Sequence, residues 1–146
     1  MSLLNLIAAF FKTLQSSELR DSRTFFEIVG ESNYQKNLMR IAGPKTSEGK
    51  KLDTVALLIP EVKNSHDSNA VRVTIGGVKV GYLARSHALE YRKYLGSKIG
   101  RCPARIVGGW KYEDDDFEGQ NEGSFGVRLK LFWPPMLKSS FHQNLN

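Results

Sequence analysis

The residues best suited to contact a ligand lie together in a polar hexapeptide, Asn64–Asn69. Asn, Asp and Ser side chains readily accept hydrogen bonds from nearby backbone amides, so we expect a fixed, outward-facing loop. Its central residues, His66 and Asp67, are adjacent and face opposite ways on an extended backbone, which makes them a poor acid–base pair. The loop is therefore typical of a binding site, with the alternative that Asp67 and Asn69 only cap a turn.

A β-hairpin must hold this loop in place. Two short alternating apolar runs, Ala70–Ile75 and Val78–Leu83, are joined by Gly76 and Gly77. Both turn positions of a tight hairpin need a positive φ, which glycine adopts at little cost, so the pairing predicts a hairpin. Alternation puts Arg72 on the face opposite the apolar residues. A rigid hairpin that carries a polar loop is a good place for a binding site.

The motifs of common enzymes, cofactor sites and metal sites are absent. The sequence has no GxxxxGK[ST] loop for phosphates, no GxSxG nucleophile motif and no Cys–His constellation. Its one cysteine, Cys102, excludes an intramolecular disulfide and favours a reducing, cytoplasmic setting. We expect no catalysis, no cofactor, no bound metal and no small-molecule substrate. The alternative is a metal-dependent nuclease that uses Asp114–Asp116, although an acidic run among glycines is more typical of a solvated loop.

The charge distribution favours a polyanionic partner. The formal net charge is +6, but the segment 111–122 alone holds six acidic residues and one lysine. The rest of the chain therefore carries +11, from 20 basic and nine acidic residues. A surface this basic attracts nucleic acid, because each phosphate that is neutralised releases condensed counterions. The alternative is a solvated basic surface that only aids solubility.

The N-terminal segment, residues 1–21, is predicted to form an amphipathic helix that ends near Asp21 or Ser22. Its apolar residues follow helical spacing, but the run is too short to span a bilayer and lacks the features of a signal peptide, so we expect no membrane contact. The helix either packs on the domain or makes a homodimer through residues 3–14. In the second case the protein would be an interaction adaptor.

Residues 22–135 are predicted to form one β domain, followed by a loosely held polar tail, residues 136–146. The fold class is mainly β: a small six-stranded OB-like or SH3-like β-barrel with an internal helix and the N-terminal helix. Glu31–Gln35 is expected to be a polar loop, and Pro103 to make its strand an edge. Beside the hairpin, the predicted elements are strands at Thr24–Val29, Thr54–Ile59, Cys102–Val107 and Ser124–Trp133, and a helix at Arg85–Leu95.

Three phrases in the chain resemble the HIRAN domain family. They are IVGESNYQ at Ile28–Gln35, LIPEVKNSHDSNAVRV at Leu58–Val73, and VGYL at Val80–Leu83. Their order and spacing are similar to the family's VG-x-x-x-Y opening, L-x-P-E-x-x-N-x-x-D-x-N-A-V-x-V centre and VGYL close. The match covers about residues 24–134 and suggests a stand-alone member of the family.

The resemblance implies an OB-like barrel that binds single-stranded DNA and captures its free 3′ end. It also implies roles for particular residues. His66 matches a base-stacking position, Asp67 the aspartate that contacts the 3′-hydroxyl, and Tyr82 an aromatic position of the pocket. Ser32 and Asn33 depart from the pattern, because they occupy positions of an arginine and a second stacking tyrosine.

The candidate nucleic-acid-binding residues combine these roles with the chemistry of the side chains. Aromatic rings can stack on bases and cations can hold phosphates in a basic groove. Each also has an ordinary structural role as an alternative, such as a half-buried core tyrosine or a solvated strand face. The set is Tyr34, His66, Asp67, Asn69, Tyr82, Arg72, Lys36, Arg40, Arg85, Arg128 and Lys130.

Overall fold

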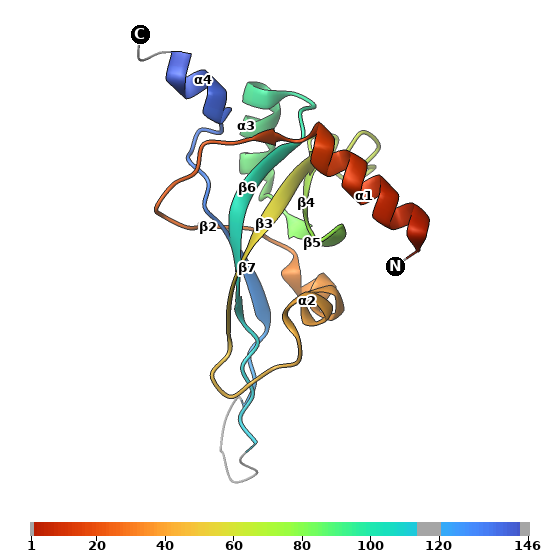
Figure 1. Cartoon of the computed structure of the whole chain (residues 1–146), viewed down its shortest axis with the longest axis vertical. Coiled ribbons are helices and arrows are strands. Elements are labelled where there is room, and N and C mark those ends of the chain that lie inside the picture. The colour runs from red at the N-terminus through yellow and green to blue at the C-terminus, as the bar shows by residue number, and fades with distance from the viewer. Residues whose placement is uncertain (1, 114–120, 144–146) are drawn as a thin grey trace.

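The computed structural model describes residues 2–113 and 121–143. One curled, mostly antiparallel sheet dominates it, with helices around the outside (Figure 1). The strands are β1 (Ser17–Glu18), β2 (Phe26–Glu27), β3 (Lys50–Pro60), β4 (Val71–Ile75), β5 (Val78–Tyr82), β6 (Gly100–Gly108) and β7 (Phe125–Leu129). The helices are α1 (Leu3–Gln15), the 3₁₀ turn η1 (Glu31–Tyr34), α2 (Gln35–Ala42), α3 (Arg85–Leu95) and α4 (Lys138–Gln143).

The sheet order is β2-β7-β6-β3-β4-β5, and β1 pairs in parallel with β6. The two ends of this order meet, because the segment that begins with β2 continues to Val29, which bridges to Tyr82 of β5. Two backbone hydrogen bonds make the bridge, at 2.8 and 2.9 Å. Gly81 permits the approach, since a Cβ on it would lie 2.7 Å from the Val29 carbonyl oxygen. The ladder therefore returns on itself as a small barrel, which confirms the predicted fold class.

The hairpin and the internal helix have the bounds that the sequence indicates. Strands β4 and β5 meet at Gly76 and Gly77, whose φ angles are 59° and 82°. Alternation along β4 turns its valines and Ile75 into the core, while α3 buries Ala88, Tyr91 and Leu95. The largest fully buried side chains come from most strands and two helices: Leu38, Leu58, Ile75, Val80, Tyr91, Ile106, Leu129 and others.

The predicted edge position of the strand around Pro103 is wrong. Strand β6 lies inside the sheet, between β3 and β7. Along β6, the pairing with β1 ends at Arg101 and the pairing with β7 begins at Ala104. Pro103 falls between these two ladders, where its missing amide hydrogen costs no ladder hydrogen bond on that side. The seventh strand, β1, is the one that the six-stranded prediction lacks.

Both ends of the chain depart from expectation. The N-terminal helix ends at Gln15, not near Asp21, because Ser17 and Glu18 join the sheet. The expected loose tail is tied to the same segment: Leu137 bridges to Leu19, and Lys138 lies 3.0 Å from Glu18. Leu137 also packs against the core, so the tail has an apolar anchor although most of its residues are polar.

The expected polar loop at Glu31–Gln35 is instead the 3₁₀ turn η1 and the start of α2. Leu38 is fully buried and anchors α2, with Ile41 and Ala42 packed on the core at helical spacing. The Gln35 amide exchanges hydrogen bonds of 2.8 and 2.9 Å with the Phe125 backbone, which docks the helix on β7. These long-range contacts stabilise a helix of only eight residues.

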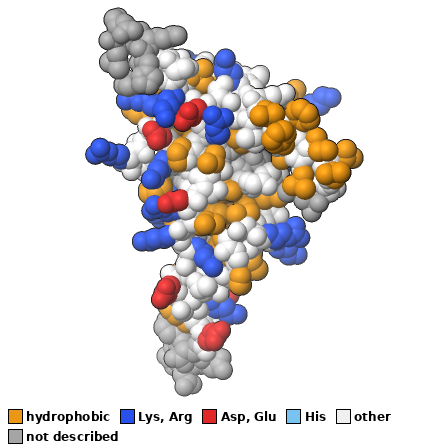
Figure 2. Space-filling view, in the orientation of Figure 1, with side chains coloured by type: hydrophobic (Ala, Val, Ile, Leu, Met, Phe, Trp, Pro, Cys, Tyr) orange, Lys and Arg blue, Asp and Glu red, His pale blue; other side chains and the backbone are white. Residues whose placement is uncertain are grey.

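Helix α1 projects beside the barrel and buries none of its residues (Figure 1). Its apolar side chains form the orange patch over α1 in Figure 2. Leu3, Leu4 and Leu14 are 64–78% exposed, far above the value for a core residue. The helix therefore keeps its sequence-predicted apolar face uncovered. Within the described part of the chain, no helix has the length and apolar character needed to cross a membrane.

Candidate functional site

A β-bulge in the hairpin brings two candidate ligand contacts onto one face. Arg72 lies opposite Tyr82 and Thr74 lies opposite Lys79, so three residues of β4 span four of β5. Val80 is the extra residue and is fully buried. Without the bulge, strand alternation would send Lys79 and Tyr82 to opposite faces. With it, their side chains meet beside Arg72 on the outside of the barrel.

Lys79 is the centre of a compact polar and aromatic cluster that we call the Lys79 cluster: Lys79, Tyr34, Tyr82 and Glu61. The Lys79 Nζ donates a hydrogen bond of 2.8 Å to the Tyr82 hydroxyl oxygen. The same ammonium lies 5.0 Å from the Tyr82 ring centroid and 5.7 Å from that of Tyr34, within range of cation–π attraction. Glu61 Oε1 is 4.0 Å from this nitrogen. The bridge at Val29 holds Tyr82 against η1, which carries Tyr34.

The electrostatics of the Lys79 cluster keep its cation charged. The hydrogen bond to Tyr82 raises the pKa of Lys79, with smaller contributions from Tyr34 and Glu61. Burial raises the pKa of Tyr82, so its phenol stays protonated at neutral pH. The Glu61 side chain is only 17% exposed, and its Oε1 is buried with no hydrogen-bond partner among the described residues. The cluster thus offers a cation and two aromatic rings, beside a carboxylate that forms an ion pair with the cation.

The polar loop Asn64–Asn69 is built as its composition predicts. The Asn64 Oδ1 accepts hydrogen bonds from the amides of His66 and Asp67, at 2.9 and 3.0 Å. The Asp67 Oδ1 accepts from the Asn69 amide at 2.9 Å. The His66 side chain is exposed, whereas Asp67 and Asn69 are half-buried. The turn-capping role of Asp67 is therefore present, and it uses the Oδ1 atom of the carboxylate.

Arg92 of helix α3 holds the polar loop in place through hydrogen bonds to its flanking backbone. The Arg92 Nη2 donates to the carbonyl oxygens of Glu61, at 2.6 Å, and Ser68, at 3.5 Å. The Glu61 amide in turn donates to the Ala70 carbonyl oxygen at 2.9 Å, which closes the base of the loop. One arginine thus fixes both arms of the loop, because its guanidinium reaches a carbonyl on each.

The loop and the Lys79 cluster adjoin through β4 and through Glu61. Glu61 belongs to the cluster by its side chain and to the loop base by its backbone. Arg72 follows the loop by a few residues and lies opposite Tyr82. The structure therefore brings Tyr34, Arg72 and Tyr82 into one surface with the loop at its border.

The remaining basic candidates have other surroundings. Arg85 is exposed at the start of α3, and the α2 bases, Lys36 and Arg40, are also exposed. Arg128 lies opposite Arg105 and 4.0 Å from Glu27, while Lys130 lies 5.5 Å from the Phe25 ring. The Glu27 carboxylate partly neutralises the charge of Arg128. The assignment of Arg128 and Lys130 to nucleic-acid binding stays a prediction.

Sequence reasoning missed Lys79 and Glu61, which lie at the centre of the site. Plain alternation treats Lys79 as a neighbour of the turn, and only the bulge turns it toward Tyr82. Gly81 was the available signal, because an isolated glycine inside a strand often marks a bulge or a close backbone approach.

The nuclease alternative cannot be placed on the structure, since Asp114–Asp116 lie outside the described residues. Among the residues that are described, no group of three or more His, Cys, Asp or Glu side chains could hold a metal ion.

Comparison with known proteins gives one match. A family model described as HIRAN domain matches residues 22–114, which include the loop and the Lys79 cluster. No curated protein and no solved structure matches the chain. The matched range excludes α1 and β7, so it covers the candidate site but not the whole barrel.

Proposed function

The chain belongs to the HIRAN domain family, whose members are generally nucleic-acid-binding modules, and we propose that it binds single-stranded DNA at a free 3′ end without catalysis. The Lys79 cluster supports this proposal most directly. It places two aromatic rings and an ammonium group with a raised pKa beside a loop with fixed backbone. Bases stack on aromatic side chains and phosphates pair with cations, so this surface suits a single strand.

The loop supplies the proposed recognition of the strand end. Asp67 uses Oδ1 to accept from the Asn69 amide, which leaves Oδ2 for a hydroxyl donor. The exposed His66 ring next to it is available to stack on the terminal base. A 3′-phosphate in place of the hydroxyl would bring negative charge against the carboxylate, so the site should discriminate between the two ends.

Ser32 and Asn33 should lower the affinity for single-stranded DNA. Both are exposed on η1, next to Tyr34, where the resemblance implies an arginine and a stacking tyrosine. Each aromatic stack contributes about 1–3 kcal/mol. Binding should therefore be weaker than with a full set of stacking residues, and it should depend steeply on salt.

Fluorescence anisotropy with paired oligonucleotides tests the proposal. One oligonucleotide ends in a 3′-hydroxyl and the other in a 3′-phosphate. We expect His66→Ala and Asp67→Asn to weaken binding to the hydroxyl form by about 5- to 100-fold, and to the phosphate form by much less. Asp67→Asn keeps an oxygen for the Asn69 amide, and Ser65→Ala is the matched loop control. Equal losses on both oligonucleotides would rule out recognition of the 3′ end, and salt-independent binding would rule out a nucleic-acid module.

A second proposal concerns α1, whose exposed apolar face favours self-association. Leu3, Ile7, Phe10 and Leu14 follow the 4-3-4 spacing of a helix-pairing seam. Lys12 is the only charged residue of the helix, so this seam carries no charge that would select a different partner. We infer that a second copy of this chain covers it, since another α1 has the same spacing.

Light scattering with a substitution in the seam tests this homodimer. Leu14→Glu should convert the dimer to a monomer, because it buries a charge in the paired seam. Gln15→Glu, at the next and exposed position, is the control and should leave the dimer intact. A monomeric wild-type chain at high concentration would refute the proposal.

A further inference from the structure

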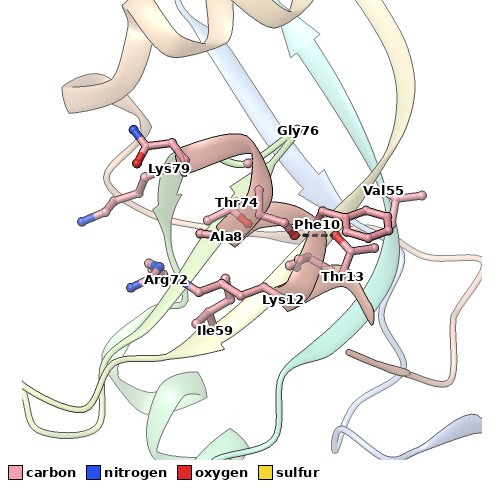
Figure 3. Close-up of a pocket in the computed structure, with 14 residues that line it drawn as sticks. Ala8, Phe10, Lys12, Thr13, Val55, Ile59, Arg72, Thr74, Gly76 and Lys79 are labelled. Carbon is pink, nitrogen blue, oxygen red and sulfur yellow. Dashed lines mark hydrogen bonds between the residues drawn. The ribbon is translucent and has the colours of Figure 1, made fainter. Parts of the chain in front are cut away.

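A groove with an apolar floor and a cationic border separates α1 from the barrel (Figure 3). Its volume is about 450 Å³, within the range of pockets that hold small ligands. Val55, Leu57 and Ile59 of β3 form its floor. Phe10 from α1 lies next to Val55 at the apolar end in Figure 3.

The cationic border is formed by side chains from three elements. Lys12 of α1, Arg72 of β4 and Lys79 of β5 all line the groove, and their nitrogen atoms gather on one side of it in Figure 3. No acidic residue lines the groove among the described residues. Because Lys79 also centres the Lys79 cluster, the groove opens directly beside the candidate site.

Lys12 and Arg72 also line a second cavity, of about 460 Å³, on their other side. That cavity is bordered by the segment that precedes the polar loop, including Glu61 and Lys63. The two cations therefore stand on a ridge between two cavities of similar volume. Their proximity is repulsive: burial lowers the pKa of Lys12, and the Arg72 guanidinium lowers it further.

We propose that Lys12 and Arg72 together hold one backbone phosphate of a bound single strand, with the adjoining nucleotides in the two cavities. The apolar floor suits a base or sugar, and a phosphate on the ridge offsets the repulsion between the two cations. Helix α1 is then part of the nucleic-acid interface. The inference rests on the proposed function, but it assigns a phosphate contact to a helix that lies outside the family match.

The first test compares the salt dependence of binding in charge variants. Anisotropy is measured with a 3′-hydroxyl oligonucleotide of about 12 nucleotides, between about 50 and 200 mM salt. Lys12→Ala should weaken binding and reduce the slope of log K against log salt by about 0.7, the value for one phosphate of a single strand. Lys12→Arg should restore the slope. Lys98→Ala, at an exposed lysine after α3, is the matched control and should change neither quantity.

The second test asks whether DNA covers the groove. Cys102 is buried and burial raises its pKa to about 12, so a thiol introduced elsewhere is the reactive one. Ala8→Cys places a thiol on the groove side of α1, and Ser97→Cys places one in the exposed turn after α3. Bound oligonucleotide should slow alkylation of Ala8→Cys at least several-fold and leave that of Ser97→Cys unchanged.

The outcomes separate the inference from the proposed function. If Lys12→Ala and Lys98→Ala behave alike and Ala8→Cys is not protected, while His66→Ala and Asp67→Asn still weaken binding, the groove proposal is wrong and the 3′-end proposal stands. If wild-type protein binds no oligonucleotide, both are wrong. Loss with Lys12→Ala alone, together with protection of Ala8→Cys, supports the groove even if the two kinds of 3′ end bind equally.

Discussion

Helices α1 and α3 come from the same kind of sequence pattern and have opposite fates. Both show apolar residues at helical spacing. Helix α3 buries Ala88, Tyr91 and Leu95 in the barrel, whereas α1 buries nothing and leaves Leu3 and Leu14 more than 60% exposed. Apolar spacing therefore indicates that a helix has a face to cover, but it does not indicate what covers it.

The two helices also approach the candidate site differently. Helix α3 contributes Arg92, whose guanidinium is occupied by the carbonyl oxygens of Glu61 and Ser68. Helix α1 contributes Lys12, which lies with Arg72 between two cavities. One basic residue shapes the loop, and the other is the one that we propose contacts a phosphate. The comparison predicts that changes in α3 act mainly on folding and changes in α1 mainly on binding and association.

The largest effect is expected at the centre of α3. Tyr91 is fully buried, and its hydroxyl donates a hydrogen bond of 2.8 Å to the Lys98 carbonyl oxygen. Tyr91→Ala should lower the free energy of unfolding by about 3–5 kcal/mol, because it leaves a large cavity. Urea denaturation measures the change. Tyr91→Phe keeps the ring and should cost only about 1 kcal/mol, so an equal loss in both variants would contradict a packing role.

A smaller effect is expected from Arg92→Ala, which removes the clamp on the polar loop. Two carbonyl oxygens lose their charged donor, so the free energy of unfolding should fall by about 1–3 kcal/mol. Affinity for the 3′-hydroxyl oligonucleotide should fall as well, since the loop loses its fixed geometry. Lys93→Ala, at an exposed position of the same helix, is the control. Unchanged hydrogen-exchange protection of the loop amides in Arg92→Ala would show that the clamp is not needed.

The buried contact beneath α3 predicts a loss of stability at alkaline pH. Burial, with a smaller effect of Asp21, raises the pKa of Cys102 to about 12 from 9.0 in an unfolded chain. Burial also raises the pKa of Tyr91. Above pH 9 the unfolded thiol has lost its proton while the folded one retains it, so the unfolding free energy decreases as pH rises.

The slope should reach about 1.4 kcal/mol per pH unit for one group. Urea denaturation at pH values from about 8 to 10.5 measures it, and Cys102→Ala should remove the thiol's share. A stability that stays constant over this range would mean that these groups are not shielded from water as the structure indicates.

The smallest effect on stability is expected on α1. Phe11 is 56% exposed, so Phe11→Ala should change the free energy of unfolding by no more than about 0.5 kcal/mol. Thermal unfolding of dilute protein measures this, because dilution removes any contribution of self-association. A loss of unfolding free energy as large as that of Tyr91→Ala would contradict the conclusion that α3 packs in the core and α1 does not.

Local sequence signals were enough to predict the hairpin, α3 and the polar loop. Gly76 and Gly77 fix the turn through their positive φ angles, and the Asn64 and Asp67 side chains bond to amides within three residues. Such features depend on neighbours along the chain. The three phrases that resemble the HIRAN family also predict the family, which the family model confirms with a match over residues 22–114.

Features that depend on distant residues were not predicted. Helix α2 is held by Gln35 on the Phe125 backbone and by Asn37 on the Lys79 carbonyl oxygen, both far along the chain. The interior place of β6 depends on where β1 and β7 end. The Lys79 cluster depends on a bulge, and the groove depends on the position of α1. None of these can be read from apolar spacing alone.

The closed ladder also has a consequence for the order in which the protein can fold. Phe26 and Glu27 pair with β7, whose residues are synthesised roughly 100 positions later. Val29 can form its bridge only after Tyr82 has been synthesised. At a synthesis rate of about 5–20 residues per second, the first ring segment stays unpaired for several seconds. The ring is therefore completed only after β7 has been synthesised.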